Sequence, residues 1–450
     1  MVSTLLDNKM QWNWSKIDLD KISFDPSFMF GVSGAAYQYL GVDNCPHSNW
    51  SSVQKNVDIA HGLESGAACD FWRNLNTDVG LMNKMKLKVF RFSFEWSDIE
   101  PEQGVFNYSA IQQYHVLFGI LAAHGITPFM TLHHYTLPAW FEKLGGFAHE
   151  KNNQYFIDFC SLMVKEFGHK VSWWATFNEP GIYISNSYML GEWPPGIKDI
   201  EHAGNVLKNI LALHVQLYKI LKKINPNINI GFAHNISPTN SYHSWNIIEK
   251  IIASYANHMC HESITEFFAS GNFKFKVPFV ANIEYHNPNA ATSFDYFGLN
   301  YYTNLLIRMR PSFQKMFTIE CRIDVAKTYA QNSCDYAQGF YRTIKDVHRR
   351  ISGPRHIPIY ITENGIADST DEYRATFIKR SLYALDKAVK EGCNVQGYFY
   401  WSLLDNFEWG LGYNMKFGLY DVDFSTQMRT LRPGAQPYLD IIAKTYQPIT

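Results

Sequence analysis

The feature that most constrains the fold is an eightfold alternation of short apolar segments with longer segments of helical periodicity. Each short segment has the length and the β-branched and aromatic content of a buried strand, whereas each longer one repeats apolar residues every three to four positions. The predicted strands are 28–34, 88–94, 127–133, 173–178, 228–232, 294–300, 357–362 and 395–402. The predicted helices are 68–85, 111–124, 156–167, 206–224, 247–268, 337–351, 374–390 and 437–446.

This alternation continues without an internal linker or low-complexity segment, and it predicts a single α/β domain, a (β/α)8 barrel over residues 1–450. Residues 1–25 are expected to form a polar N-terminal lead-in. A doubly wound sheet is the alternative, but it would not place polar or functional side chains at the exit of nearly every strand. In a barrel those exits form the ring where active sites lie. The residues in question are Gln38, Arg91, His134, Glu179, Asn300, Glu363 and Trp401.

Two of these strands end in the same pattern, an apolar run that leads into a glutamate. The apolar run 359–362 leads into Glu363 and is followed by an Asn-Gly turn, and the run 173–177 leads through Asn178 into Glu179, where Pro180 stops the strand. A buried carboxylate is costly unless it is paired or functional. Two carboxylates at the ends of two parallel strands are what hydrolysis of a glycosidic bond requires.

The bulk composition excludes several classes of partner. With 40 basic and 41 acidic residues, the net charge of -1 offers no field for nucleic acid or an anionic membrane. No apolar run reaches the ~18 residues of a membrane span, and the first ten residues lack a signal-peptide core. The seven cysteines are scattered without CxxC spacing, which indicates free thiols and a cytoplasmic location. His258 and His261 are expected to be a surface pair rather than a metal site.

The sequence resembles glycoside hydrolase family 1, the retaining β-glucosidase family, over essentially the whole chain. The resemblance is carried by Thr176-Phe-Asn-Glu-Pro180 and Ile361-Thr-Glu-Asn-Gly365, together with the segments 31–38 and 423–433. Either motif could occur by chance, but the two in order on separate strands are highly specific. The resemblance implies a (β/α)8 barrel, with Glu179 as the general acid/base and Glu363 as the nucleophile.

The physics of a retaining site supports this division of roles. Its two carboxyl groups lie ~5–5.5 Å apart, so that the charge on one disfavours the charge on the other and one stays protonated. Arg91 and Tyr302 match the family positions that contact the nucleophile and favour its ionised form. Formation of the glycosyl ester then removes the charge of the nucleophile, and the acid/base can activate water.

The same resemblance implies a binding site for one sugar ring. Trp401 matches the family platform for the apolar face of the pyranose, and Asn178 matches the contact to the 2-hydroxyl. The hydroxyl-binding positions of the family, Asn178 among them, are occupied here by Gln38, His134, Asn178, Glu408 and Trp409. Asn300 and Phe417 match further substrate-binding positions, as does Tyr302.

Two residues indicate the type of glycoside. The branch of the family that hydrolyses 6-phosphorylated sugars has Ser in place of Glu408, and a carboxylate there would repel a phosphate. The plant thioglucosidases have Gln in place of Glu179, so an O-glycoside is expected here. We therefore expect a cytoplasmic retaining β-glycosidase that hydrolyses terminal β-D-glucosides, with β-galactosides and β-fucosides as further candidates. The substrate is a small-molecule or oligosaccharide β-glycoside, and no metal or organic cofactor is implied.

Two alternatives remain open at this point. A catalytically silent barrel that binds a glycan or a protein partner is one, although such relatives usually lose one of the two glutamates and this chain keeps both. A transglycosidase, in which an acceptor sugar replaces water, is the other, because the same residues serve both reactions. Residues 305–335 follow the sixth strand and are expected to shape the outer part of the cleft.

Overall fold

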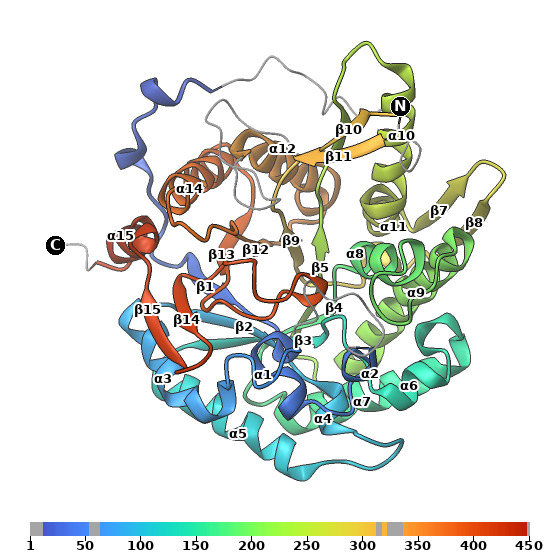
Figure 1. Cartoon of the computed structure of the whole chain (residues 1–450), viewed down its shortest axis with the longest axis horizontal. Coiled ribbons are helices and arrows are strands. Elements are labelled where there is room, and N and C mark those ends of the chain that lie inside the picture. Colours follow the sequence, from blue (N-terminus) through green and yellow to red (C-terminus); the bar gives the residue numbers. More distant parts are fainter. Residues whose placement is uncertain (1–11, 54–63, 312–316, 322–335, 448–450) are drawn as a thin grey trace.

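Eight parallel strands close into a barrel whose axis runs roughly along the line of sight in Figure 1. The computed structural model describes residues 12–53, 64–311, 317–321 and 336–447. Around the barrel the order is β1-β13-β12-β9-β5-β4-β3-β2, so each barrel strand lies between its neighbours in the chain, and the predicted (β/α)8 fold is confirmed. The barrel strands are β1 Met29–Ser33, β2 Val89–Ser93, β3 Thr127–His133, β4 Trp173–Asn178, β5 Asn229–Asn235, β9 Phe297–Asn300, β12 Ile359–Asn364 and β13 Val395–Trp401.

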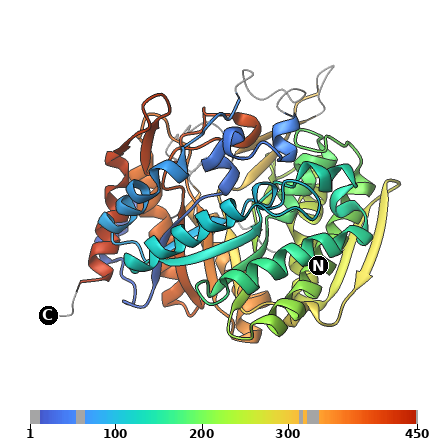
Figure 2. The same cartoon turned by 90° about the horizontal axis from the view of Figure 1, so that it is seen from below.

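Helices surround the barrel on its outside, and the main hydrophobic core lies between them and the strands (Figures 1 and 2). Side chains at their N-termini help to set where they begin: Asn107 caps α5 at the backbone N–H groups of Ser109 and Ala110, and Asp199 caps α9 at that of His202. The longer helices are α3 Phe71–Lys84, α5 Tyr108–Ala123, α7 Asn153–Phe167, α9 Ile200–Ile224, α10 Ile247–Asn257, α11 Ser263–Ser270, α12 Ala337–Val347, α14 Arg374–Lys390 and α15 Gln436–Thr445. The shorter ones are α1 Ala36–Asn44, α2 Asn49–Val53, α4 Trp96–Ile99, α6 Ala139–Lys143, α8 Pro180–Ile184 and α13 Gly353–Arg355.

Three small sheets outside the barrel were not predicted. β6 Thr239–Ser241 pairs with β10 Leu305–Met309, which also pairs with β11 Phe317–Cys321. The hairpin of β7 Asn272–Val277 and β8 Ala281–His286 lies along the side of the molecule in Figure 2, and β14 Tyr420–Asp423 pairs with β15 Met428–Leu431. Parts of the segment expected to shape the outer cleft, 312–316 and 322–335, lie outside the described residues.

Two further differences concern helices and the N-terminal lead-in. The predicted helix 247–268 is divided into α10 and α11 by a π-helical turn, His258–Glu262, which the apolar periodicity does not reveal. Residues 1–11 of the lead-in lie outside the described residues. The following part packs on the barrel helices, because the ring of Trp12 lies 5.1 Å from that of Tyr383 in α14 and 5.6 Å from that of Tyr341 in α12.

The barrel interior is filled by aromatic side chains near the beginning of the strands. Val89, Phe129, Tyr296, Tyr360 and Phe399 form a separate buried cluster there. The ring of Phe129 lies 5.0 Å from that of Tyr296 and 5.2 Å from that of Phe399. Because this end is packed with large side chains, the polar residues of the strands are left at the opposite, C-terminal end.

Candidate active site

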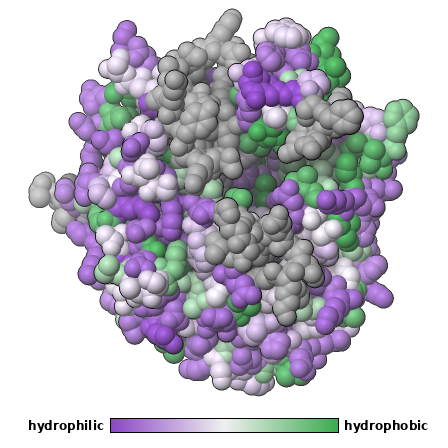
Figure 3. Space-filling model, viewed as in Figure 1, coloured by the Kyte–Doolittle hydropathy of each residue, from purple (hydrophilic) through white to green (hydrophobic). Residues whose placement is uncertain are grey.

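The side chains predicted from the strand exits gather at the C-terminal end of the barrel. Glu179 directly follows β4, Glu363 lies near the end of β12, and Arg91 lies in β2. All three are buried, with exposed fractions of 5%, 3% and 0%. The molecular surface seen from the side of Figure 1 is hollowed near its centre (Figure 3). The strands therefore bring two carboxyl groups and one guanidinium group into a shared interior site.

Glu363 is held by one cation and one hydroxyl group. Nη1 of Arg91 forms a short ion pair with Oε1, and the hydroxyl of Tyr302 donates to Oε2 at 2.6 Å. Arg91 is fully buried and comes from β2, which is not a neighbour of β12, so its side chain reaches across the barrel. A buried carboxylate that accepts from a guanidinium and a phenol is stabilised in its charged form.

Within the part of the chain that the structure describes, Glu179 has only neutral hydrogen-bond donors. Oε1 accepts from the side-chain amides of Asn300 at 2.6 Å and Asn235 at 3.1 Å, and the hydroxyl of Tyr135 donates to Oε2 through a short hydrogen bond. Burial, followed by the charge on Glu363, raises the pKa of Glu179 to about 7, although the three hydrogen bonds act in the opposite direction. This carboxyl group therefore titrates near neutral pH, well above its ordinary range.

A continuous chain of hydrogen bonds links the two carboxyl groups. Arg91 donates through Nη2 to Oδ1 of Asn178 at 2.7 Å, and Asn300 donates to the same oxygen at 3.2 Å as well as to Glu179. Because an arginine can only donate, Oδ1 of Asn178 must face it, and this fixes the orientation of both amides. The path then runs from Glu363 through Arg91, Asn178 and Asn300 to Glu179, so the relative position of the two acids is set by buried side chains.

The orientation of Asn178 also determines the tautomer of His134. Its amide nitrogen lies 3.2 Å from Nε2 of His134, which must accept, and so the imidazole proton lies on Nδ1. Burial, with the charges of Arg91 and His133, lowers the pKa of His134 well below its ordinary value, and the ring is neutral. Nδ1 is buried and has no hydrogen-bond partner among the described residues.

A second polar group lies beside the first. Nε2 of Gln38 donates to Oε2 of Glu408 at 3.0 Å and to Oδ1 of Asn406 at 2.9 Å. Oε1 of Gln38 is buried without a partner among the described residues. Burial raises the pKa of the half-buried Glu408 to about 8, with smaller contributions from the charges on Glu363 and Glu179. Gln38 and Glu408 together offer acceptors, and a proton to donate, for adjacent hydroxyl groups.

Aromatic rings line the rest of the site. The ring of His134 is stacked 6.0 Å from Trp401 and 6.2 Å from Trp409, and Tyr302 meets the edge of Phe417 at 5.9 Å. Both tryptophans are almost fully buried, with exposed fractions of 3% and 4%. Flat apolar faces next to fixed hydrogen-bonding groups are the surfaces on which a sugar ring packs.

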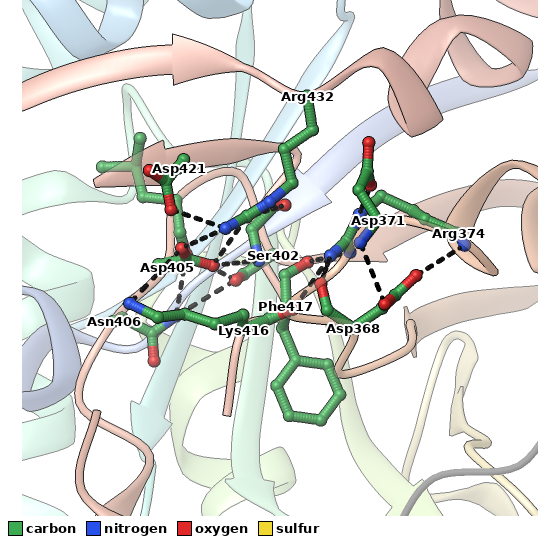
Figure 4. A network of polar contacts seen from close by, with 12 residues as sticks. Asp368, Asp371, Arg374, Ser402, Asp405, Asn406, Lys416, Phe417, Asp421 and Arg432 are labelled. Carbon is green, nitrogen blue, oxygen red and sulfur yellow. Dashed lines mark hydrogen bonds and ion pairs between the residues drawn. The ribbon is translucent and has the colours of Figure 1, made fainter. Parts of the chain in front are cut away.

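Two buried arginines hold the loop that carries Asn406, Glu408 and Phe417 (Figure 4). Arg432 forms two hydrogen bonds with the carboxylate of Asp405, at 3.1 and 2.9 Å. Arg374 donates to the backbone carbonyl groups of Phe417 and Lys416, at 3.0 and 2.9 Å. The loop after β13 is thus fixed by charge-assisted hydrogen bonds rather than by packing alone.

Three site residues were not predicted: Tyr135, Asn235 and Asn406. Asn235 ends β5, and it could have been found had that strand been extended by three residues beyond its predicted end at 232. Tyr135 follows His134 directly, but its backbone has φ 73°, and no periodicity indicates where such a side chain points. Asn406 lies two residues before Glu408 in a loop with no regular structure.

Within the described ranges, no three His, Cys, Asp or Glu side chains are grouped so as to hold a metal ion. The expectation of a surface pair at His258 and His261 is wrong for His261, which is buried in the π-helical turn and lies 2.9 Å from Oδ1 of Asn257. None of the described helices combines the length and apolar character needed to cross a bilayer.

An eight-stranded parallel barrel with two unequally surrounded carboxyl groups and aromatic walls at its C-terminal end defines the class of barrel glycoside hydrolases. The profile of glycosyl hydrolase family 1 matches residues 20–446, and the chain belongs to this family. It is a retaining β-glycosidase, as the resemblance in sequence implied.

Similar proteins agree with this assignment but differ in their substrates. Beta-glucosidase A of Thermotoga maritima is 28% identical over 449 residues, which cover 93% of this chain and 97% of the relative. A 6-phospho-beta-galactosidase of Staphylococcus aureus is also 28% identical, over 466 residues, with 92% and 97% covered. The solved structure of a beta-glycosidase from Pyrococcus horikoshii shares 31% identity at a TM-score of 0.81, with 94% of this chain and 96% of that chain covered.

Proposed function

We propose that the enzyme hydrolyses the terminal non-reducing β-D-glucosyl residue of unphosphorylated O-glycosides by double displacement. β-Galactosides and β-fucosides are further candidate substrates, and the aglycone is a small molecule or a second sugar. Glu179 protonates the leaving oxygen while Glu363 attacks the anomeric carbon. Water activated by Glu179 then releases the sugar with its β configuration retained.

The observation that carries this proposal is the difference in surroundings between the two carboxyl groups. Glu363 accepts from the guanidinium of Arg91 and from Tyr302, which suits a charged nucleophile. Glu179 accepts from neutral donors, and its pKa of about 7 leaves a large fraction protonated at neutral pH. When Glu363 becomes an ester its charge disappears, one cause of the raised pKa is removed, and Glu179 can act as a base.

The hydrogen-bonding groups around the acids support a sugar as the substrate. Asn178 lies between Arg91 and His134, where an amide can contact the 2-hydroxyl beside the nucleophile. Gln38 and Glu408 provide the paired acceptors for hydroxyl groups farther along the ring. Trp401 supplies the flat face against which the pyranose packs.

Glu408 supports an unphosphorylated sugar over a 6-phosphorylated one. A phosphate dianion next to this carboxyl group would meet either a like charge or a single donor proton. Two cations of the region are already engaged, Arg91 with Glu363 and Lys416 with Asp405 at 3.7 Å. The 6-phospho-beta-galactosidase relative makes this the substrate question to test first.

The test measures nitrophenol release from the 4-nitrophenyl β-glucoside, β-galactoside, β-fucoside, β-mannoside and β-glucoside 6-phosphate. We expect the wild-type enzyme to hydrolyse the unphosphorylated glucoside, and Glu363→Ala to lose this activity by a factor of ~10⁴ or more. Azide should restore part of the activity of Glu179→Ala, with formation of the β-glucosyl azide. A folded wild-type enzyme that is inactive on every sugar would favour the silent binding barrel. Higher kcat/KM on the phosphorylated glucoside would refute the assigned substrate.

A matched pair of variants separates the contribution of Glu408. Glu408→Ser removes the carboxyl group that opposes phosphate, and Glu408→Gln keeps its size and hydrogen bonding without its charge. We expect both variants to lose kcat/KM on the glucoside, and the ratio of phosphorylated to unphosphorylated turnover to rise at least about tenfold in Glu408→Ser. An unchanged ratio would show that Glu408 does not discriminate against phosphate. Addition of an acceptor sugar, with analysis of the products, distinguishes hydrolysis from transglycosylation.

We also propose a reducing, cytoplasmic compartment. Five cysteines, Cys45, Cys69, Cys160, Cys260 and Cys393, are free thiols, and all but Cys260 are buried. Buried unpaired cysteines are typical of proteins that fold where disulfides are kept reduced. Localisation of the tagged full-length protein in cell fractions tests this proposal.

A further inference from the structure

Tyr135 contacts the carboxyl group of Glu179 through its hydroxyl group, as Tyr302 contacts that of Glu363. Its ring is buried, and it packs 4.9 Å from the ring of Trp193 and 5.3 Å from that of Trp409. The hydroxyl donates to Oε2 of Glu179. The backbone of Tyr135 has φ 73°, a conformation that is unfavourable for a bulky residue and is retained only where the surroundings impose it. The side chain is therefore fixed against Glu179 by both packing and backbone.

The partners of Glu179 determine which of its oxygens can carry a proton. Oε1 accepts from Asn300 at 2.6 Å and from Asn235 at 3.1 Å. The amide of Asn300 must present its nitrogen to Glu179, because the same nitrogen faces Oδ1 of Asn178, an oxygen already oriented by Arg91. Two amide N–H groups occupy both lone pairs of Oε1. The transferable proton therefore belongs on Oε2, the oxygen that Tyr135 contacts.

A tyrosine hydroxyl can serve both protonation states of that oxygen. It accepts a hydrogen bond when Oε2 is protonated and donates one when Oε2 is charged, whereas the amide nitrogens on Oε1 can only donate. Burial, followed by the charges on Glu179 and Glu363, raises the pKa of Tyr135 well above its ordinary value, so the tyrosine keeps its own proton throughout.

We propose that Tyr135 is a catalytic residue, which stabilises the carboxylate of Glu179 as the acid/base gives up its proton; this inference rests on the proposed function. In the first step the O–H bond at Oε2 breaks as the proton moves to the glycosidic oxygen. The bond from that oxygen to the anomeric carbon breaks while the carboxylate of Glu363 bonds to the same carbon. The hydroxyl of Tyr135 turns to donate to the negative Oε2. In the second step a proton from water returns to Oε2, the hydroxide portion bonds to the anomeric carbon, the bond from that carbon to Glu363 breaks, and Tyr135 again accepts.

Tyr135→Phe tests this proposal because it removes one oxygen and keeps the ring against Trp193 and Trp409. The hydrogen bond from Tyr135 lowers the pKa of Glu179, so its loss should move both titrations of Glu179 upward by about one pH unit. The alkaline limb of kcat/KM is measured with phenyl β-glycoside, whose leaving group needs a proton. The acid limb of kcat is measured with 2,4-dinitrophenyl β-glycoside, for which hydrolysis of the glycosyl enzyme limits the rate.

We expect both limbs to move upward in Tyr135→Phe, and kcat for the dinitrophenyl substrate at pH 6 to fall about tenfold. Tyr302→Phe is the matched control, because it removes the same atom from the partner of Glu363. It should leave the alkaline limb of kcat/KM in place. If Tyr135→Phe slows both substrates equally with no movement of either limb, Tyr135 only packs and the proposal is overturned.

The azide experiment separates this inference from the function on which it rests. If Glu179→Ala is not rescued by azide, the assignment of the acid/base fails, and the role of Tyr135 fails with it. If rescue occurs and the pH profiles of Tyr135→Phe match the wild type, only the role of Tyr135 is refuted. Equal near-ultraviolet circular dichroism of the two tyrosine variants confirms that both are folded.

Discussion

Replacement of Arg374 by Met should destabilise the protein far more than the same replacement at the surface. Arg374 is fully buried and makes six hydrogen bonds, to the carboxylate of Asp371, the hydroxyl of Tyr400 and four backbone carbonyl groups (Figure 4). Among the described residues, the carbonyl oxygens of Ile366, Asp368 and Phe417 accept from this side chain alone. Each would be left buried without a donor.

The magnitude follows from those orphaned groups. A buried acceptor without a donor costs about 1–3 kcal/mol, so three of them cost about 6 kcal/mol before the loss of the pair with Asp371 is counted. Asp371 keeps a hydrogen bond from the backbone of Gly434 at 2.6 Å, which limits that further loss. We therefore expect the free energy of unfolding to fall by about 6 kcal/mol in Arg374→Met, and by less in Arg374→Lys, which retains the charge.

Urea unfolding followed by tryptophan fluorescence measures this change, with Arg349→Met as the control. Arg349 pairs with Asp346 over one helical turn, but its side chain is 71% exposed, and its replacement should change the free energy of unfolding by less than about 1 kcal/mol. A difference between the two variants of under 1 kcal/mol would refute the argument from buried acceptors. Because Arg374 also holds Phe417 beside Tyr302, kcat/KM of Arg374→Met should fall as well.

Three further predictions use the same structure. Burial raises the pKa of Glu95 from 4.5 to about 7, so the folded state holds a proton that the unfolded state releases, and the free energy of unfolding falls as pH rises through this range. Urea titrations at pH 5 and 7.5 should show that Glu95→Gln is more stable relative to wild type at the higher pH. An equal difference in stability at both pH values would contradict this. A Cβ at Gly365 would lie 1.9 Å from the carbonyl oxygen of Trp401, so Gly365→Ala should lower kcat/KM about tenfold or more. Unchanged kinetics would show that the ends of β12 and β13 can separate freely. Phe268 is buried with its ring 4.0 Å from that of Phe232, so thermal unfolding should show that Phe268→Ala lowers the free energy of unfolding by about 3–5 kcal/mol, while kcat stays within about twofold of wild type. A large loss of kcat would show that Phe268 helps to position the active site.

The barrel could be predicted from the sequence because its strands are buried on both faces. A strand such as Ile359–Asn364 is a continuous apolar run, and such runs between helical segments indicate a parallel sheet. The β7 strand was missed although its residues alternate between exposed and buried, a pattern that the sequence of Asn272–Val277 displays. The pairing of β6 with β10 could not be predicted, because it joins segments more than sixty residues apart and depends on the closed barrel.

The candidate site was predictable to the extent that its residues sit at strand ends. Glu179, Glu363 and Asn300 follow from the end of an apolar run, and the barrel brings such ends together. Tyr135 and Asn235 were missed for different reasons. The first depends on an unusual backbone conformation, and the second on where β5 ends, which is the least certain feature of any predicted strand. The side-chain direction of Tyr135 and the end of β5, rather than the residue types, limited the prediction of the site.

The different surroundings of Glu179 and Glu363 follow from the order of strands around the barrel. Glu179 receives its donors from β5, from β9 and from the residues after β3, and all of these donors are neutral. Glu363 receives its charged donor from β2, across the interior, where the side chain of Arg91 is long enough to reach. A cation on a strand beside β4 would favour the charged form of Glu179 as well and would remove the proposed general acid. The closed barrel thus places the buried Arg91 beside Glu363, the proposed nucleophile, and leaves neutral groups, Tyr135 among them, around Glu179.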